Sequence, residues 1–175
     1  MNPRGRLPIL KHDDYVVFES VAVLYYLDLK YPEPPIFGRT AEEAGVIMRV
    51  ICEFEAYAED HLMKIVRALF EGGVNETNIG ELTRAMLAVA SEARTIEGRL
   101  SKGDWIVGDA YSAVDMVVFP AIQVLLRALK KPGAGVLASR FLPVEVNYPA
   151  LGRWLDRVAA LPGYGKTRPP HWHTS

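Results

Sequence analysis

The segment from residue 2 to residue 27 has the sequence NPRGRLPILKHDDYVVFESVAVLYYL. Two short apolar runs, Leu7–Leu10 and Tyr15–Phe18, lie on either side of a polar cluster of turn-forming residues, Lys11–Asp14. Apolar, partly β-branched runs that flank such a cluster are typical of a β-hairpin. Pro8 stands near the start of the first run, where a strand tolerates a residue without an N–H donor. The segment therefore predicts a hairpin whose first strand begins beside a proline.

A helix is predicted directly after the hairpin, followed by a linker. Apolar residues from Val21 to Leu29 recur at helical spacing, and the pattern stops at Tyr31–Pro32. The next residues, Pro32-Glu33-Pro34-Pro35, form a stiff extended connector. We therefore predict a first domain at residues 1–32, a linker at 33–39 and a second domain at 40–175.

The second domain is predicted to be all helical, with four main helices. Thr40 and Glu43 form a candidate capping box for a first long helix that ends at Gly72–Gly73. Periodic apolar residues predict three more helices, from about Glu76 to Lys102, from Ser112 to Lys130, and after Pro149 to Leu161. The fold class is thus α+β but mostly α.

Composition narrows the class of protein. The chain has 175 residues, of which 23% are charged, and a formal net charge of −1, so nothing indicates a nucleic-acid surface. The N-terminus has no apolar signal-peptide core, and the longest apolar run, Ala113–Leu129, is interrupted by polar residues and too short to span a membrane. A single cysteine, Cys52, fits a reducing compartment. We predict a soluble cytoplasmic protein without membrane or nucleic-acid partners.

The motifs NPRGRLPIL at residues 2–10 and FESVAVLYYL at residues 18–27 resemble a known family. They are similar to the middle and end of the thioredoxin-like domain of cytosolic glutathione S-transferases, whose pattern is N-P-x-G-x-V/L-P-x-L, a hairpin, and E-S-x-A-I-x-x-Y-L. The resemblance continues through the SAVD motif at residues 112–115 and the WLDRVAALP motif at residues 154–162. It implies a partial thioredoxin-like domain, a β-hairpin plus helix, followed by the family's all-helical C-terminal domain.

The resemblance also implies a site for glutathione as co-substrate. The family's proline at the position of Pro8 is cis, and the residue before it, here Leu7, pairs through its backbone with the cysteinyl unit. Glu19 and Ser20 match the dipeptide that holds the γ-glutamyl group, because a hydroxyl and free helix amides suit its carboxylate and a carboxylate suits its ammonium. Arg6 stands where several classes place a lysine for the glycine carboxylate. A simpler interpretation makes Ser20 only a helix cap.

Other candidates are weaker. Ser112 and Asp115 form an S-x-x-D capping box with a structural role, so we expect no catalytic role for Asp115. Cys52 lies among periodic apolar positions and is predicted to be a buried small residue, not a nucleophile. His171 and His173 lack a ligand cluster, so no metal site is predicted. The family builds its electrophile pocket from the first long helix and the C-terminus, which yields five candidates, Met48, Glu55, Tyr57, His61 and Trp172.

In the family a catalytic Ser, Cys or Tyr follows the first strand, upstream of the segment that this chain matches. No residue here matches that position, so we assign no catalytic residue and expect an N-terminally truncated member. A truncated gene model, a cloned fragment and a degenerate domain remain as explanations. An open strand edge and an uncovered apolar face are expected to result from the missing strands.

We predict a glutathione S-transferase-like protein that binds glutathione and, when complete, conjugates it to a small hydrophobic electrophile. It is expected to form a homodimer in which the helices that begin at Thr40 and Glu76 pack against the first domain of the partner. The alternative is a non-catalytic glutathione-transferase-like protein-interaction module. A truncated chain that folds poorly and has no activity is the third interpretation.

Overall fold

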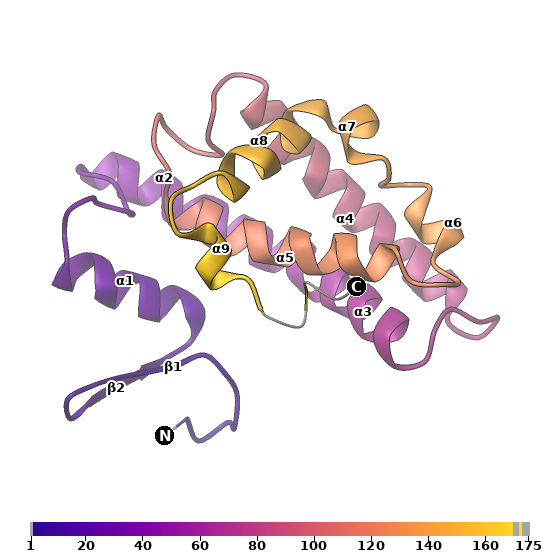
Figure 1. Ribbon diagram of the computed structural model, residues 1–175, viewed down its shortest axis with the longest axis horizontal. Coiled ribbons are helices and arrows are strands. Elements are labelled where there is room, and N and C mark those ends of the chain that lie inside the picture. Colours follow the sequence, from indigo (N-terminus) through magenta and orange to yellow (C-terminus); the bar gives the residue numbers. More distant parts are fainter. Residues whose placement is uncertain (1, 170–171, 173–175) are drawn as a thin grey trace.

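The computed structural model describes residues 2–169 and residue 172, and it begins with the predicted hairpin (Figure 1). Strands β1 (Ile9–His12) and β2 (Tyr15–Phe18) pair antiparallel, from Ile9 opposite Phe18 to His12 opposite Tyr15. The hairpin prediction is confirmed, although β1 runs past the apolar residues to His12. The turn shrinks to two residues, of which Asp13 has φ 53°, a left-handed conformation that Asp tolerates.

Helix α1 (Ser20–Lys30) follows the hairpin and forms a loosely packed unit with it. None of its residues is fully buried. Val21 and Leu24 pack against the main core, and the Tyr25 ring lies 5.5 Å from the ring of the core residue Phe37. Figure 1 shows the hairpin and α1 together at one end of the molecule, beside the helical bundle. The first unit is therefore attached to the bundle through a small part of α1.

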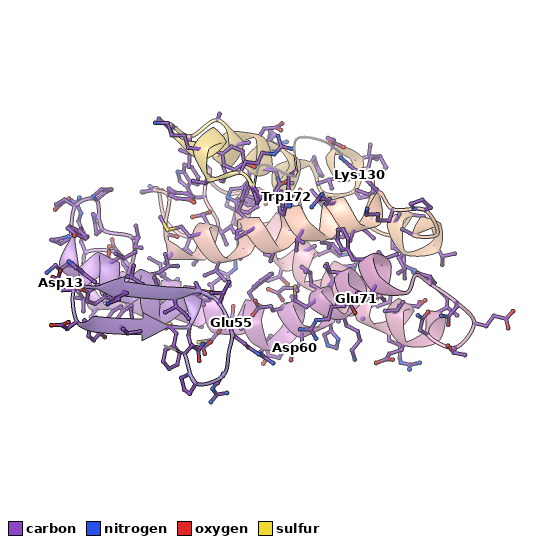
Figure 2. All side chains as sticks on the ribbon, turned by 60° about the horizontal axis from the view of Figure 1, so that its bottom comes forward. Asp13, Glu55, Asp60, Glu71, Lys130 and Trp172 are labelled. Atoms are coloured by element: carbon purple, nitrogen blue, oxygen red, sulfur yellow. The ribbon has the colours of Figure 1, made fainter. Side chains whose placement is uncertain are left out.

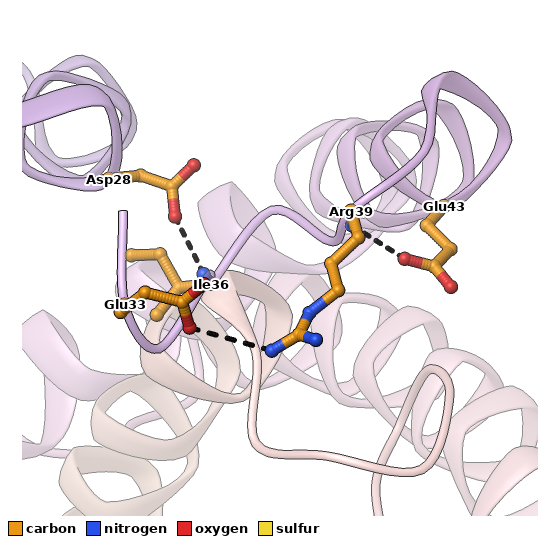
Figure 3. Close-up of polar contacts among 5 residues, drawn as sticks. All are labelled: Asp28, Glu33, Ile36, Arg39 and Glu43. Atoms are coloured by element: carbon orange, nitrogen blue, oxygen red, sulfur yellow. Dashed lines mark hydrogen bonds and ion pairs between the residues drawn. The ribbon is translucent and has the colours of Figure 1, made fainter. Parts of the chain in front are cut away.

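The segment after α1 forms hydrogen bonds both with α1 and with the helical bundle. Figure 3 shows its bond to Asp28 of α1. The Asp28 carboxylate of α1 accepts a hydrogen bond of 2.6 Å from the Ile36 N–H, and the Ile36 carbonyl accepts one of 2.8 Å from the Ala113 N–H. Glu33 and Arg39 add an exposed ion pair of 3.5 Å. Ile36 thus connects the first unit to the start of the central helix of the bundle.

The described residues after this segment are mostly helical, as predicted. One long helical path consists of α2 (Ala41–Phe54), the π-helical segment η1 (Glu55–Glu59) and α3 (Asp60–Glu71). The remaining helices are α4 (Ile79–Leu100), α5 (Ala113–Leu129), α6 (Gly135–Ala138), α7 (Val144–Asn147), α8 (Pro149–Ala159) and α9 (Tyr164–Thr167). Figure 1 shows α5 at the centre of the bundle. The short helices α6 and α7 lie between Lys130 and Pro149, where the sequence pattern predicts no main helix.

The start of α5 is fixed by a fully buried carboxylate. Ser112 and Asp115 form the predicted capping box, in which the Asp115 carboxylate accepts from the Ser112 N–H at 2.9 Å. The same carboxylate accepts from the Trp154 Nε1–H at 2.8 Å and from the Ile106 N–H at 3.3 Å. Asp115 therefore joins α5 to α8 and to the loop before it, a structural role that fits the expectation.

Two local predictions need correction. The Thr40 hydroxyl accepts from the Glu43 N–H at 3.2 Å as expected, but the Glu43 carboxylate accepts from the Arg39 N–H at 2.6 Å instead of the Thr40 N–H. Cys52 is exposed on the outer face of α2, whereas its neighbour Ile51 is fully buried. The prediction of a buried Cys52 was wrong because it lies one position past the buried face of the helix.

Candidate functional site

The open end of the hairpin brings together two of the predicted site segments. Ile9 and Phe18 are the last paired residues at this end, so Pro8 and Glu19 are the next residues along the two strands. The Leu7–Pro8 bond is cis, as the family resemblance implies. The Leu7 side chain is 85% exposed, so it contributes little to the fold.

Asn2 organises the loop that leads into this end of the hairpin. Its side-chain Nδ2 donates to the Arg6 carbonyl at 2.9 Å, and its Oδ1 accepts from the Arg4 N–H at 2.9 Å. Gly5, at φ 64°, supplies the left-handed turn that the loop needs. Asn2 is buried and was not among the predicted site residues, although an Asn-Pro pair followed by Gly is typical of such a turn. The hydrogen bonds of Asn2 therefore position the backbone of the segment that contains Arg6 and Leu7.

Ser20 is the first residue of α1 and lies beside free helix amides. The helix begins after Glu19, which is its N-cap residue, and α1 has neither a side-chain cap nor an acidic residue in its first turn. Because Ser20 does not occupy the N-cap position, the simpler capping interpretation does not describe this structure. The first N–H groups of a helix lack intrahelical partners and carry a partial positive charge. This end of α1 can therefore accept a carboxylate.

Glu19 has an unusual backbone conformation, with φ 71° and ψ 127°. A positive φ is rare for a residue other than glycine and costs free energy, so it persists where the surrounding structure enforces it. The Glu19 side chain is exposed at the start of α1. Such strained positions cluster at ligand sites.

The π-helical segment η1 of the bundle lies close to Glu19. Burial raises the pKa of the Glu55 carboxyl above its ordinary value, and the negative charge of Glu19 raises that pKa further. Figure 2 shows Glu55 where the bundle meets the hairpin unit. Tyr57, on the same segment, is 64% exposed. Short π-helical segments occur frequently at functional sites. The start of α1 and η1 are thus near enough for the charges of Glu19 and Glu55 to interact.

Not all predicted pocket residues meet. Trp172 lines two cavities that are bordered by α5 and the C-terminal segment. The described residues that line these two cavities do not include the other four candidates, Met48, Glu55, Tyr57 and His61. In Figure 2, Trp172 and Glu55 lie on opposite sides of α5. One cavity, of about 520 Å³, is mostly apolar, and the other is rich in cations.

Neither a metal cluster nor a membrane span is found within the described part of the chain. Among residues 2–169 and 172, no group of three or more His, Cys, Asp or Glu side chains could hold a metal ion. His171 and His173 lie outside the described residues. Of the helices formed by the described residues, none combines the length and apolar character needed to cross a membrane.

Sequence comparison defines the class of protein. Residues 59–162 match the glutathione S-transferase C-terminal domain, and residues 1–29 match the glutathione S-transferase N-terminal domain. The chain belongs to the cytosolic glutathione S-transferase family. Its fold is accordingly that of the C-terminal part of a thioredoxin-like domain followed by the family's helical domain.

Individual relatives are distant. The chain is 28% identical over 137 residues to Glutathione S-transferase F10 of Arabidopsis thaliana, covering 75% of this chain and 63% of the relative. It is also 28% identical over 174 residues to Probable glutathione transferase omega-2 of Caenorhabditis elegans, covering 95% of this chain and 63% of the relative. The chain thus spans less than two thirds of the length of these two proteins.

Solved structures agree on the fold. A class Gtt2 glutathione S-transferase of Vibrio parahaemolyticus superposes with a TM-score of 0.73 at 22% identity, covering 93% of this chain and 73% of that one. Poplar glutathione transferase F1 gives a TM-score of 0.74 at 19% identity, covering 94% and 73%. At these identities the likeness concerns the fold alone.

Proposed function

We propose that the open end of the hairpin binds glutathione. The Leu7 backbone, beside Pro8, pairs with the cysteinyl unit, and Arg6 meets the glycine carboxylate. The Ser20 hydroxyl and the first amides of α1 hold the γ-glutamyl carboxylate, while Glu19 holds its ammonium. The uncapped start of α1 next to a strained Glu19 is the observation that carries this proposal.

The second substrate is proposed to be a small hydrophobic electrophile, to which glutathione is conjugated. The segment η1 supports this proposal, because its exposed Tyr57 offers an aromatic surface. The same segment carries Glu55, whose carboxyl interacts with the charge of Glu19. The residues assigned here bind and orient the co-substrate. No catalytic group of this chain is part of the proposal.

Calorimetric titration of the 175-residue chain with glutathione tests the proposed site. We expect Ser20→Ala to weaken binding about tenfold, because a hydrogen bond to a charged group is lost. Ser91→Ala, an exposed serine on α4, is the matched control and should leave the affinity unchanged. A folded chain that gives no glutathione signal, or equal affinities for both variants, would refute the assignment.

We also propose that two copies pair through α2 and α4 in a cytoplasmic homodimer. Each of these helices carries an exposed apolar side chain, Val46 at 38% and Leu87 at 48% exposure. Light scattering coupled to gel filtration should give a dimeric mass that falls to the monomeric value in Val46→Glu/Leu87→Glu. Val136→Glu, at an exposed apolar position on α6, should remain dimeric. A wild-type monomer would exclude the homodimer.

A further inference from the structure

The turn of the β-hairpin carries a group of ionisable side chains that the proposed function does not use. The Tyr26 hydroxyl of α1 and the His12 Nδ1 of β1 form a hydrogen bond of 2.8 Å. On the other side of the imidazole, the His12 Nε2 lies 3.8 Å from a carboxylate oxygen of Asp13, the first residue of the turn. A hydroxyl, an imidazole and a carboxylate thus follow one another in this order. We refer to Tyr26, His12 and Asp13 as the turn cluster.

The contacts of His12 on its two sides select one tautomer of the ring. The Asp13 carboxylate is too far away for a hydrogen bond but close enough to attract a proton-bearing nitrogen, so the ring proton is favoured on Nε2. The Nδ1 then has a free lone pair and accepts the hydrogen bond that the Tyr26 O–H donates. A hydroxyl bonded to a neutral imidazole, which a third group orients, has the arrangement of an activated nucleophile.

The turn cluster is open to solvent on its outer side. The Asp13 side chain is 94% exposed and that of His12 is 30% exposed. The Tyr15 ring stacks on the Tyr26 ring with 4.9 Å between ring centres and 29° between ring planes, and Tyr15 is 52% exposed. Aromatic faces bind other rings by offset stacking. A small aromatic molecule therefore finds a flat surface next to the Tyr26 hydroxyl.

The turn cluster is separate from the proposed glutathione site. His12 and Tyr15 are the paired residues at the turn end of the hairpin, whereas Ile9 and Phe18 are paired at its open end. Three residues along a strand span about 10 Å. Figure 2 shows Asp13 at the end of the hairpin that lies away from Glu55. An inference about the turn cluster therefore does not depend on glutathione binding.

We propose that Tyr26 is a nucleophile that activated aryl esters of carboxylic acids acylate, with His12 as its general base. The Tyr26 Oη attacks the carbonyl carbon of the ester, and its proton passes to the His12 Nδ1. The bond between Oη and the carbonyl carbon forms, and the bond between that carbon and the aryl oxygen breaks. The departing phenol then takes the proton from His12, so the products are an ester of Tyr26 and a free phenol. The charge of Asp13 stabilises the imidazolium that forms during the step.

Acetylation of the full chain by p-nitrophenyl acetate tests the proposal, with peptide mass spectrometry to measure the rate at each tyrosine. Tyr31, 60% exposed at the end of α1, is the internal control. Among the described residues, no histidine forms a hydrogen bond with Tyr31. We expect Tyr26 to react about a hundredfold faster than Tyr31, the lower end of what a positioned general base contributes. In the urea-unfolded chain the two rates should be equal.

Substitutions in the turn separate the base from simple packing. His12→Gln keeps an acceptor oxygen but has no basic nitrogen, so it should reduce the rate at Tyr26 to that at Tyr31. Asp13→Asn should lower the rate about threefold, because an exposed charge stabilises the imidazolium weakly. Asp14→Asn, at the next exposed residue of the same turn, is the matched control and should leave the rate unchanged.

Circular dichroism melting verifies the fold of each variant. Equal rates at Tyr26 and Tyr31 in the folded wild-type chain would overturn the proposal without any variant. A rate at Tyr26 that His12→Gln leaves unchanged would overturn the assignment of the base. Equal effects of Asp13→Asn and Asp14→Asn would overturn the role of Asp13.

Discussion

Asp115 shows how one residue can hold several elements. Its fully buried carboxylate accepts hydrogen bonds from the Ser112 N–H and hydroxyl, the Ile106 N–H and the Trp154 indole. Burial raises the pKa of Asp115, while these hydrogen bonds, from Ser112 and Trp154 above all, act to lower it. The group is costly to bury, and the four hydrogen bonds that its oxygens accept offset part of that cost.

Asp115→Ala should therefore destabilise the protein by about 3 kcal/mol, because several buried donors lose their acceptor at once. Trp154→Phe removes the indole donor and keeps the other bonds, so we expect a smaller loss. Urea unfolding followed by circular dichroism measures both. Asp109→Ala, at an exposed position in the preceding loop, should change the unfolding free energy by less than about 0.5 kcal/mol. A similar value for Asp115→Ala would contradict the buried network.

The electrostatic interaction between Glu19 and Glu55 leads to a second prediction at the residue scale. Since the charge of Glu19 raises the pKa of Glu55, Glu19→Gln should move that pKa toward the ordinary value for a glutamate. Because its pKa is raised in the folded state, protonated Glu55 contributes to the stability of the folded protein at low pH. This contribution is lost as the pH rises through the pKa of Glu55 in the folded state. Carboxyl NMR titration measures the change. Glu76→Gln, at an exposed loop position, should leave the Glu55 titration unaltered.

At the scale of elements, most of the fold could be predicted because its patterns are local. The hairpin follows from two apolar runs around a polar turn, and the start of α5 follows from the Ser112–Asp115 box. The π-helical turn η1 could not be predicted, because an insertion of this kind depends on packing between Phe54, Ala58 and neighbouring helices. This segment interrupts the first long helix that the sequence predicts, and its Tyr57 is 64% exposed.

The candidate site was predictable only in part, because some of its residues come together through tertiary packing. Leu7, Pro8, Glu19 and Ser20 form recognisable motifs, and the hairpin register brings them to one end. The proximity of Glu19 and Glu55 arises from packing between the hairpin unit and the bundle, which no local pattern encodes. The cationic cavity likewise unites Lys130 with Arg168 through tertiary structure.

Helix α8 depends on a residue of another helix for its N-terminal cap. The Glu97 carboxylate of α4 accepts from the Ala150 N–H at 2.9 Å and from the Leu151 N–H at 2.8 Å. Glu97→Ala should destabilise the protein by about 1 to 2 kcal/mol, as the loss of a strong helix cap does. Glu97→Gln, which keeps one acceptor oxygen, should cost less. Thermal unfolding measures both, with the exposed Glu71→Ala as the control, and a wild-type Tm for Glu97→Ala would argue against the cap.

At the scale of the whole molecule, stability is distributed unevenly. The largest fully buried side chains belong to the helical bundle, and among the described residues none comes from the hairpin or α1. The first unit has one two-stranded sheet, and an isolated hairpin is at best marginally stable. We therefore expect the hairpin and α1 to open more readily than the bundle.

The hydrogen bond from the Ile36 N–H to Asp28 should control this opening, because Ile36 also bonds to Ala113 at the start of α5. In Asp28→Ala, amide hydrogen exchange of residues 9–30 should accelerate about tenfold, the effect of losing a charge-assisted hydrogen bond, while exchange in α3, α4 and α5 stays unchanged. Glu33→Ala is the control, since its exposed pair with Arg39 contributes little. Exchange measured by mass spectrometry separates the two segments. Uniform acceleration through the bundle would instead mean that the two parts unfold together and that Asp28 stabilises the molecule as a whole.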